Sequence, residues 1–241
     1  MVNYMDNIVY ENVNADELIT FLKPVSGLGA VSEIMVKLSQ NDISLRVVDP
    51  AHVAMVGAVW TTPTGQEMDI GIDYDAAMKA LALFSGQDIR VTITDGSVII
   101  KGKKGQRTVP RVDPDAIGAP REIPALNTPV QIQTTVADLR DAMKGVNGIS
   151  DHLKIYTAGD VATIETTDDR TAAEFTIAGT VQSSDGDAAA SYPWDYFFNV
   201  VKALTDGDLN ISIGTDYPIT IDATRGDIKQ RYLIAPRIEQ E

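Results

Sequence analysis

The feature that most constrains the fold is an internal repeat. Short stretches of the first half recur in the same order in the second half: "ADEL" from Ala15 as "ADL" from Ala137, "KAL" from Lys79 again from Lys202, and "DIRVTI" from Asp88 as "DLNISI" from Asp208. The members of each pair are separated by about 120 residues, and a shared offset of this kind indicates a duplicated fold. The chain has 241 residues, which is enough for two units of about 100–150 residues each.

Hydrophobic periodicity predicts helices and strands in each half. Helical spacing predicts helices at Ala15–Lys23, Tyr74–Phe84, Val136–Val146 and Pro193–Leu204. We expect Asp75 and Thr135 to act as N-terminal caps and Pro193 to occupy a first turn. Strands are predicted at Glu33–Leu38, Ile43–Val48, Ala54–Trp60, His152–Thr157, Val161–Thr166, Glu174–Ala178, Leu209–Ile213, Ile219–Ala223 and Ile228–Ile234. Each unit is therefore an α+β arrangement of helix, strands, helix, strands.

One further hairpin and one connector complete this organisation. Asp95-Gly96 within Asp88–Gly102 predicts a hairpin whose tight turn has positive φ angles. The stretch Val112–Pro129 is rich in proline and has little periodicity, which predicts an extended connector. We therefore expect an N-terminal domain at residues 1–111, a connector at 112–129 and a C-terminal domain at 130–241.

Composition excludes several classes of protein. Hydrophobic residues make up 44% of the chain, which supports a substantial core. No apolar run approaches the roughly 18 residues that span a bilayer, and the opening "MVNYMDNIVYENV" lacks the features of a secretion signal. Cysteine is absent, which excludes disulfides, thiol nucleophiles and cysteine metal sites.

The charge balance is strongly acidic, with a formal net charge of −14. A generic nucleic-acid binder would show a basic excess, so wide electrostatic attraction is not how this chain would hold DNA. Each predicted helix nevertheless carries a lysine, and the four recur near repeat-equivalent positions: Lys23, Lys79, Lys144 and Lys202. The alternative for each of them is an ordinary solvated helix face.

Catalytic chemistry is not evident. His52 and His152 lie in different halves without a spacing partner of the HExxH kind, and no G-x-S-x-G occurs. The "GKKG" of Gly102–Gly105 lacks the frame of a phosphate loop. Paired carboxylates could serve as a glycosidase acid and base, but such pairs arise by chance among 34 acidic residues. We expect a protein that is not an enzyme and that uses no metal or cofactor.

Two motifs carry a family resemblance. "ISLRVVDPAHVAMV", Ile43–Val56, runs as a strand, stops at Asp49-Pro50, admits a histidine and becomes apolar again. This segment and the C-terminal "YLIAPRIEQE", Tyr232–Glu241, resemble archaeal and eukaryotic sliding clamps, the proliferating cell nuclear antigen (PCNA) family. The resemblance extends from about Tyr10 to the end of the chain, so residues 1–9 form an extra N-terminal segment.

The resemblance implies a DNA-clamp fold with two similar domains, helices on the concave inner face and sheets outside. It implies a homotrimer that closes head to tail around double-stranded DNA without reading its sequence. DNA polymerase, clamp loader, ligase and nucleases would dock through a short peptide motif, the PIP box. A closed ring is retained by topology, which reconciles a net charge of −14 with a DNA partner. The implied setting is replication and repair in the cytoplasm, with the nucleoid, of an archaeon or its virus.

The resemblance also assigns residues. The DNA-facing set would be Lys23, Lys79, Arg140, Lys144 and Lys202, with the loop residues Lys101, Lys103, Lys104 and Arg107. The partner-peptide pocket would comprise Val48, His52, Val53, Met55, Pro218, Leu233, Ala235, Pro236 and Ile238, covered by Ile117, Ile123 and Leu126 of the connector. A buried, hydrogen-bonded histidine is the alternative for His52, and simple core packing is the alternative for Met55.

The subunit interface would pair one strand segment with another in the next subunit: Thr108, Val109, Pro110 and Arg111 with Ala172, Glu174, Thr176 and Ala178. Pro110 departs from the family pattern because proline cannot donate a ladder hydrogen bond. We therefore expect a trimer weaker than typical, or one supported by Arg107 or Arg111 against acidic residues near Asp168–Glu174. The connector is also less acidic than the family pattern, so partner peptides are expected to differ.

Two other functions stay open at this point. A clamp-like protein could bind replication proteins as a monomer without encircling DNA. An acidic all-β hydrolase could use two carboxylates for catalysis.

Overall fold

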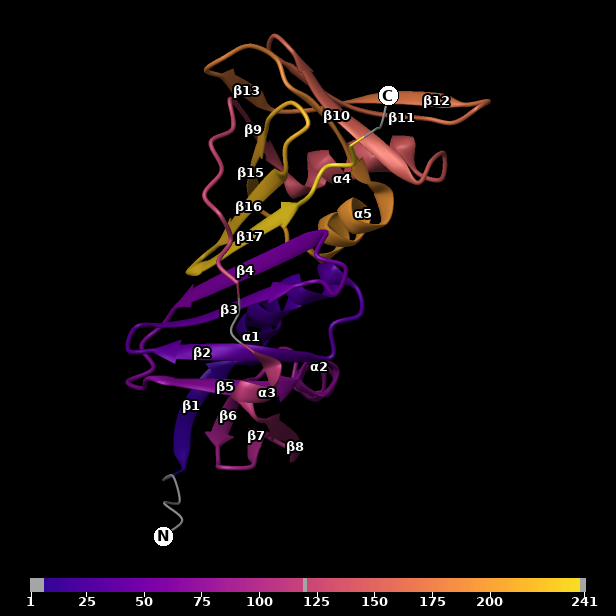
Figure 1. The fold of residues 1–241 in the computed structure, drawn as a ribbon. Coiled ribbons are helices and arrows are strands. Elements are labelled where there is room, and N and C mark those ends of the chain that lie inside the picture. Colours follow the sequence, from indigo (N-terminus) through magenta and orange to yellow (C-terminus); the bar gives the residue numbers. More distant parts are fainter. Residues whose placement is uncertain (1–6, 119–120, 239–241) are drawn as a thin grey trace.

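The computed structural model describes residues 7–118 and 121–238 as two stacked halves joined by a connector along one side (Figure 1). Residues 1–6 of the expected N-terminal extension, Ala119 and Pro120 of the connector and residues 239–241 of the C-terminal motif lie outside the described residues. The extension is not wholly separate from the fold, because Ile8 and Val9 already belong to the first strand.

The N-terminal half alternates strands with two helices. Its elements are β1 (Ile8–Asn14), α1 (Ala15–Leu22), the 3-10 helix η1 (Lys23–Leu28), β2 (Glu33–Ser39), β3 (Asp42–Val48), β4 (Ala54–Thr61), β5 (Met68–Asp73), α2 (Tyr74–Ala82), β6 (Asp88–Ile93), β7 (Ser97–Gly102) and β8 (Gly105–Val112). The short α3 (Pro114–Ile117) lies in the connector.

The C-terminal half repeats this order with one additional strand, β13, and without the 3-10 helix. Its elements are β9 (Val130–Thr135), α4 (Val136–Val146), β10 (His152–Ala158), β11 (Val161–Thr167), β12 (Ala172–Ile177), β13 (Thr180–Ser183), β14 (Ala189–Pro193), α5 (Trp194–Ala203), β15 (Asp208–Ile213), β16 (Ile219–Arg225) and β17 (Ile228–Ile234).

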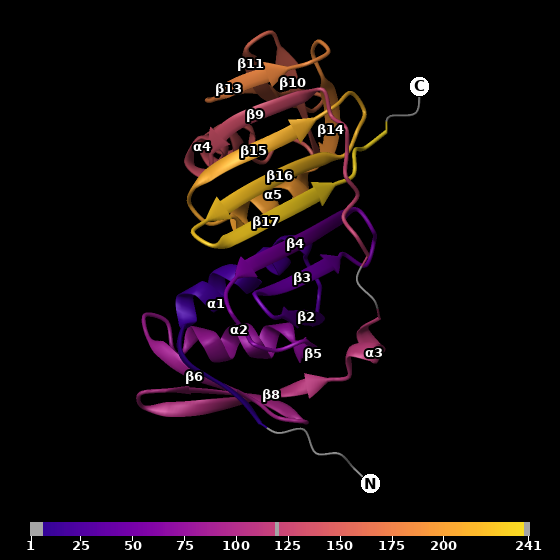
Figure 2. The ribbon, with the colours of Figure 1, turned by 90° about the vertical axis from the view of Figure 1, so that its left-hand side faces the viewer.

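The strand order shows the duplication directly. A large sheet runs β1-β6-β7-β8-β5-β2-β3-β4-β17-β16-β15-β9-β13, and a smaller sheet runs β12-β11-β10-β14. The orders β1-β6-β7-β8 and β5-β2-β3-β4 of the first half correspond to β9-β15-β16-β17 and β14-β10-β11-β12 of the second. The fold is α+β, and the four long helices gather behind the sheet that faces the viewer in Figure 2.

One pairing joins the two halves within the large sheet. β17 runs antiparallel to β4 from Ile228 opposite Trp60 to Ile234 opposite Ala54. Behind it, α5 packs closely on η1, where a Cβ on Gly27 would lie 3.1 Å from the backbone of Val200. The halves are therefore held together by a continuous ladder and a close helix contact.

The structure corrects one part of the repeat alignment. Tyr74 and Trp194 begin equivalent helices and Asp88 and Asp208 begin equivalent strands, with the same separation in both pairs. This alignment places Lys202 opposite Ala82 and not opposite Lys79, as the "KAL" match predicts. The error is close to one helical turn, so both lysines still lie on the same helix face.

Several local predictions are confirmed and others are wrong. Thr135 caps α4, but Asp73 and not Asp75 caps α2, because the helix begins two residues earlier than a cap at Asp75 requires. The β6–β7 hairpin is confirmed, yet neither Asp95 nor Gly96 has a positive φ. The Thr94 N–H donates to the Ser97 carbonyl across the turn, and the Ser97 N–H donates to the Thr94 hydroxyl at 3.0 Å.

The strands that periodicity did not predict are β1, β5, β9, β13 and β14, and β8 was expected only from the family resemblance. β5 contains Gly71, a residue that weakens a strand pattern. A Cβ there would meet the Val112 carbonyl oxygen of β8 and the Ile117 side chain, so glycine permits close backbone approach. The connector prediction is also adjusted, since Val112 ends β8 and a short helix follows.

Candidate functional site

The turn after β3 is built around a buried carboxylate. Asp49 is 1% exposed and accepts hydrogen bonds from the N–H groups of Ala51 (2.8 Å) and Ala54 (2.6 Å). It also accepts one from the hydroxyl of Tyr196 on α5 at 2.8 Å. These donors compensate the burial of its charge. The strand therefore stops at Asp49-Pro50 where a carboxylate ties the turn to the other half of the chain.

The Tyr196 donor is available over a wide pH range. Burial, followed by the hydrogen bond and charge of Asp49, raises the pKa of Tyr196 to about 12 from 10.0. A raised tyrosine pKa favours the neutral, donating form. The bond therefore contributes fully below pH 10 and is lost as the pH rises through about 12.

His52 lies at the tip of this turn and its side chain is exposed. Its φ of 59° is a left-handed conformation that few non-glycine residues adopt. The His52 N–H donates to the Asp49 carbonyl at 3.0 Å, which helps to hold that conformation. The alternative of a buried, hydrogen-bonded histidine is therefore wrong.

Three apolar side chains lie side by side next to the turn. Val48 of β3 is opposite Met55 of β4, and Met55 is opposite Leu233 of β17. Strand alternation points Ala54 and Val56 into the core and leaves Met55 half-buried on the opposite, outer face. The core-packing alternative for Met55 is therefore wrong, and the row is an apolar strip that crosses the junction of the two halves.

The connector covers part of the same outer face. A Cβ on Gly57, which lies on the same face of β4 as Met55, would come within 2.9 Å of the Ile123 side chain. Arg46 of β3 and Glu122 of the connector form an exposed ion pair at 3.5 Å. Leu126 is half-buried further along the connector. Glycine at position 57 therefore lets Ile123 lie flat on the sheet beside the strip.

Ile117 does not join this group. Its side chain lies over Gly71 of β5, which is three strands away from β4 in the sheet. Strands are spaced about 4.8 Å apart, so Ile117 is too distant to cover the turn. Sequence reasoning assigned it with the other connector residues because the course of α3 was not predicted.

The C-terminal tail forms the other side of the strip. The Ala235 N–H donates to the Val53 carbonyl at 2.8 Å, which brings the tail beside the turn. Beyond it, the Arg237 guanidinium lies 3.1 Å from the Asp151 carboxylate. Pro218 and Pro236 are half-buried next to these strands, whereas Ile238 is 74% exposed. The described tail is therefore anchored on both sides of Pro236 and ends in an uncovered apolar side chain.

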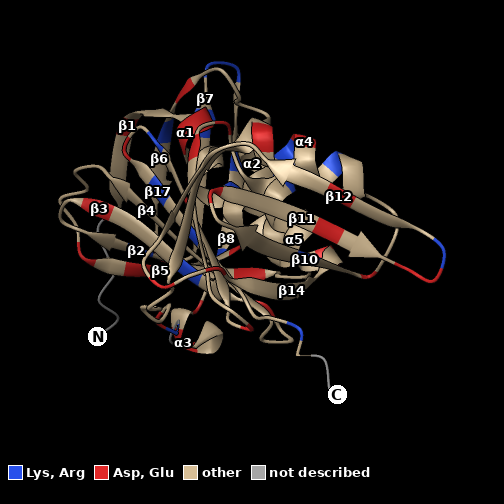
Figure 3. Cartoon of the chain, turned by 90° about the horizontal axis from the view of Figure 1, so that it is seen from above, with Lys and Arg blue, Asp and Glu red and all other residues tan. Residues whose placement is uncertain are grey.

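The exposed helix lysines have acidic neighbours in their own helices. Lys79 lies 3.9 Å from Asp75, and Lys144 lies 2.6 Å from Asp141. Figure 3 shows acidic and basic residues interspersed on these helices. Exposed pairs of this kind contribute little to stability, but they leave the helix surface nearly neutral and not basic.

Arg140 and Lys23 are partly occupied within the chain. The Arg140 guanidinium donates to the Leu204 carbonyl at the end of α5 (2.7 Å) and pairs with Asp206 at 3.2 Å. Lys23 begins η1 and is half-buried. Burial, followed by repulsion from Arg140, lowers the pKa of Lys23, while Asp206 opposes the shift. Arg140 therefore joins α4 to the end of α5 within the C-terminal half, a role that sequence reasoning missed.

The remaining basic residues of the predicted DNA-facing set are exposed. Lys202 projects from α5, and Figure 3 shows basic residues at the tip of the hairpin beyond β7. That hairpin carries Lys101, Lys103, Lys104 and Arg107, all of which are exposed. The predicted DNA-facing set therefore divides into residues on the helices and residues on a separate basic hairpin.

β8 and β12 both present unpaired backbone groups. β12 pairs only with β11, and β8 pairs with β5 only through Arg111 and Val112. The Arg111 N–H donates to the Gly96 carbonyl on the β7 side. By alternation, the backbone groups of Thr108 and Pro110 point to the open side of β8. Pro110 therefore costs the β7–β8 ladder nothing and removes a donor from the open edge.

The predicted interface residues are divided between open and occupied positions. Thr108, Pro110, Ala172, Glu174 and Thr176 are exposed on the two edges, whereas Val109 is 2% exposed and belongs to the core. Arg111 donates to the Thr94 carbonyl (2.8 Å), and the Ala178 carbonyl accepts the Thr134 hydroxyl (2.6 Å). The Arg111 side chain and the Ala178 carbonyl therefore already bond within the chain, although the Arg111 Nε is buried without a partner among the described residues.

Two exposed apolar residues beside these edges were not predicted. Phe175 of β12 is 43% exposed and its ring lies against Gly145 of α4, while Leu83 at the end of α2 is 59% exposed. Gly145 is needed there because a Cβ would overlap the ring. Exposed large apolar residues that lie beside open strand edges are typical of contact surfaces, and the sequence pattern alone gave no sign of their exposure.

Two other kinds of site were sought within residues 7–118 and 121–238. This part of the chain holds no group of three or more His, Cys, Asp or Glu side chains arranged to bind a metal. It also contains no helix that is long and apolar enough to cross a membrane.

Comparison with known proteins decides the family. No protein-family model matches the chain. The DNA polymerase sliding clamp of Methanosarcina mazei is 31% identical over 225 residues, which cover 88% of this chain and 91% of that protein. The chain belongs to the DNA polymerase sliding clamp family. The sliding clamp of Methanothrix thermoacetophila is 27% identical over 95% of this chain and 98% of its own length.

Solved sliding clamp structures share the fold. The PCNA of Archaeoglobus fulgidus, bound to the C-terminal region of FEN-1, is 25% identical and superposes with a TM-score of 0.86 over 98% of this chain and all of that one. The PCNA of Thermococcus kodakaraensis, at 20% identity, has a TM-score of 0.81 over 96% of this chain and 99% of its own. These comparisons bear out the α+β clamp fold that the sequence motifs indicate.

Proposed function

We propose that this chain acts as a DNA sliding clamp, in which identical subunits close head to tail into a ring around duplex DNA and partner proteins dock on the outer face. The observation that carries the proposal is the junction between the two halves. At this junction, β17 of the second half pairs with β4 of the first. Because the halves are copies, each also carries the equivalent of the other strand, and these two strands have no such partner within the described part of the chain. We also propose that the division into residues 1–111, 112–129 and 130–241 corresponds to the two clamp domains and their connector.

The unused surfaces are β8 and β12. The repeat makes β8 equivalent to β17 and β12 equivalent to β4, the two strands that join the halves. Both have open edges, so β8 of one subunit can pair with β12 of the next. Such a contact is heterologous, and heterologous contacts generate a ring when the rotation closes. The family resemblance supplies the number of subunits, three.

The repeat also supports a specific register for this contact. Matching the hairpins of the two halves makes Pro110 equivalent to Leu233 and Ala172 equivalent to Met55, which are paired within the chain. Pro110 would therefore lie opposite Ala172, and Thr108 opposite Glu174. In this register the open-edge backbone groups of both strands face one another.

With this register, we expect the ring to be weaker than one whose subunits are joined by an uninterrupted ladder of hydrogen bonds. At the pair of Pro110 and Ala172, one of two hydrogen bonds cannot form, which costs roughly 1 kcal/mol per contact. Native mass spectrometry during dilution, at low and high salt, should show trimers dissociating into single subunits. Replacing Pro110 with threonine should shift that midpoint to lower concentration. A trimer that persists unchanged to nanomolar concentration would contradict the weak-ring proposal.

We place the docking surface on the apolar strip of Val48, Met55 and Leu233, bounded by the His52 turn, Ile123 and the C-terminal tail. A short apolar peptide motif could bury its side chains there because Val48 and Met55 are partly exposed beside Leu233 and the strip lies at the junction of both halves. The FEN-1 segment bound to the Archaeoglobus fulgidus PCNA supports a docking role for this fold. Polymerase, clamp loader, ligase and nucleases are the proposed partners.

DNA would pass along the helix surface. Replacing both Lys79 and Lys202 with glutamate should reduce loading on DNA and polymerase stimulation several-fold at low salt, because like charge would then face the phosphates. The matched control reverses Lys37 and Lys229, which are exposed on the outer face of the sheet. Equal activity of both double variants in a primer-extension assay would show that the helix surface does not face DNA.

Two alternatives are separated by simple measurements. A clamp-like monomer would remain a single subunit at every concentration in the mass measurement. An acidic hydrolase would cleave polysaccharide, whereas we propose a processivity factor without catalytic activity that lengthens polymerase products on primed circular DNA. We further propose a cytoplasmic, nucleoid-associated location, in keeping with its archaeal relatives.

A further inference from the structure

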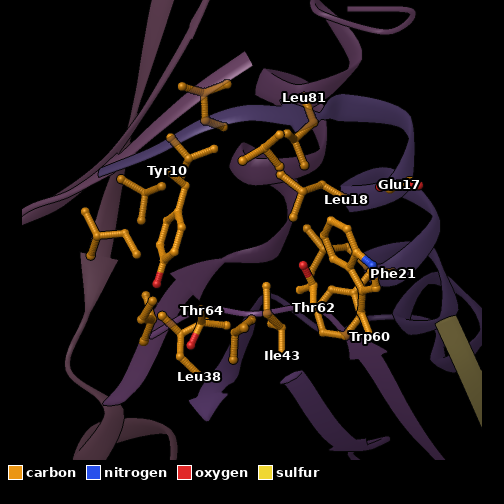
Figure 4. A pocket seen from close by; sticks show the side chains of 18 of the residues that line it. Tyr10, Glu17, Leu18, Phe21, Leu38, Ile43, Trp60, Thr62, Thr64 and Leu81 are labelled. Atoms are coloured by element: carbon orange, nitrogen blue, oxygen red, sulfur yellow. The ribbon is translucent and has the colours of Figure 1, made fainter. Parts of the chain in front are cut away.

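A cavity of about 340 Å³ lies inside the N-terminal half, and no part of the proposed clamp function uses it. Its walls include Tyr10 of β1, Leu18 and Phe21 of α1, Trp60 of β4 and Leu81 of α2 (Figure 4). The lining is mostly apolar. A volume of this size falls within the roughly 300–1,000 Å³ of typical small-molecule sites.

The repeat explains why this space is present. Ala77 of α2 lines the cavity, and its equivalent in α5 is Phe197, which is 0% exposed and stacks with Tyr192 at 6.3 Å between ring centroids. In the C-terminal half, a phenyl ring therefore occupies the position that has only a methyl group in the N-terminal half. The β1 strand also bulges between Tyr10 and Val13 at the cavity wall. The cavity therefore lies where this half has the smaller side chain and an irregular strand.

One polar group in the wall makes no well-formed hydrogen bond. The Tyr10 hydroxyl is buried and has no partner of hydrogen-bond geometry within the described residues. Burial raises the pKa of Tyr10, and the nearby Thr64 hydroxyl opposes that rise (Figure 4). The Thr64 oxygen, however, already donates to the Ser39 carbonyl (2.6 Å) and accepts from the Gln66 N–H (3.1 Å). A buried hydroxyl without a partner is costly. A ligand with a hydrogen-bond acceptor at this point would satisfy it.

We propose that the cavity binds an uncharged, apolar small molecule, aromatic or alicyclic, that carries one hydrogen-bond acceptor for the Tyr10 hydroxyl. A peptide segment is disfavoured because strands of the sheet, β1 and the two helices surround the space on several sides. An anion is disfavoured because Glu17 stands at the lining and the apolar wall offers no compensating cation (Figure 4). The inference does not depend on the clamp function.

Calorimetric titration of the full chain with three probes tests the proposal. 2-Acetylnaphthalene supplies an apolar body with one acceptor, 2-methylnaphthalene lacks the acceptor, and 2-naphthoate carries a charge. We expect the ketone to bind once per chain and to raise the melting temperature, and the carboxylate to bind at least about tenfold more weakly. Absence of ketone binding at its solubility limit would overturn the proposal.

Two variants locate the binding. Ala77→Phe copies the ring of the C-terminal half into the cavity and should abolish ketone binding, whereas Ala82→Phe, an exposed position of the same helix, should not. Tyr10→Phe should weaken the ketone about five- to tenfold and leave 2-methylnaphthalene unchanged. This second comparison decides the matter even if Ala77→Phe fails to fold. Equal ketone affinity in Tyr10→Phe and the unaltered chain, or loss of binding in Ala82→Phe, would contradict the assignment.

Discussion

Replacing Phe175 with arginine is expected to release single, folded subunits from the ring. The register derived from the repeat places Phe175 of one subunit opposite Arg107 of the next, in a pair whose side chains approach closely. In the unaltered chain, an arginine over an aromatic ring is a favourable contact. In the variant, two like charges would be brought together as the contact is desolvated. We expect a loss of roughly 3 kcal/mol per contact, or about a hundredfold in its dissociation constant.

A matched control exists for this variant. Phe198 of α5 is 38% exposed, close to the 43% of Phe175, but lies on the helix surface away from both open edges. Phe198→Arg introduces the same charge and removes a similar ring, and the trimer should persist. Sedimentation velocity at a concentration where the unaltered ring is intact gives the comparison. An intact Phe175→Arg ring would show that the subunits meet elsewhere.

Replacing Met55 and Leu233 with alanine should weaken the binding of a PIP-box peptide by about 10- to 100-fold. Both residues lie in the apolar strip, on β4 and β17, and each truncation removes roughly 1 kcal/mol of buried contact with the peptide. Met55 and Leu233 lie on the strands that join the two halves of one chain and not on the open edges of β8 and β12, so the oligomeric state should not change. Fluorescence anisotropy of a labelled peptide measures the affinity.

Val59→Ala is the control for the docking surface. Val59 is 41% exposed and lies on the same outer face of β4 as Met55, but at the far end of the strand from the His52 turn. Its truncation should leave peptide affinity unchanged. If Val59→Ala weakens the peptide as strongly as the double variant does, the peptide lies along the whole strand and the proposed strip is wrong.

The sequence predicted elements with strong local patterns well. Helix α4 has its predicted bounds because Leu139 and Met143 keep helical spacing and Thr135 supplies the cap. Strands with weak patterns were missed: β5 contains a glycine that packs against β8, and β14 ends at a proline. Their stability comes from neighbouring strands that a local pattern does not contain.

Site prediction shows the same division. The turn at Asp49 was recognised from its sequence, but its bond to Tyr196 spans the two halves and has no local signal. Arg140 carried the right charge on the right helix, yet the fold uses its guanidinium to cap α5. The residue type indicates what a side chain can do, but the neighbouring groups in the fold determine whether it is free to do so.

The most direct test of the central claim compares retention on circular and linear DNA. Chains loaded on a nicked circular plasmid would be passed through a gel-filtration column at high salt, before and after one restriction cut. If the subunits enclose the duplex, the protein should stay with the circle and leave the cut molecule through its ends, because topology and not charge retains it. Equal loss from both forms, or equal retention on both, would contradict the enclosing ring.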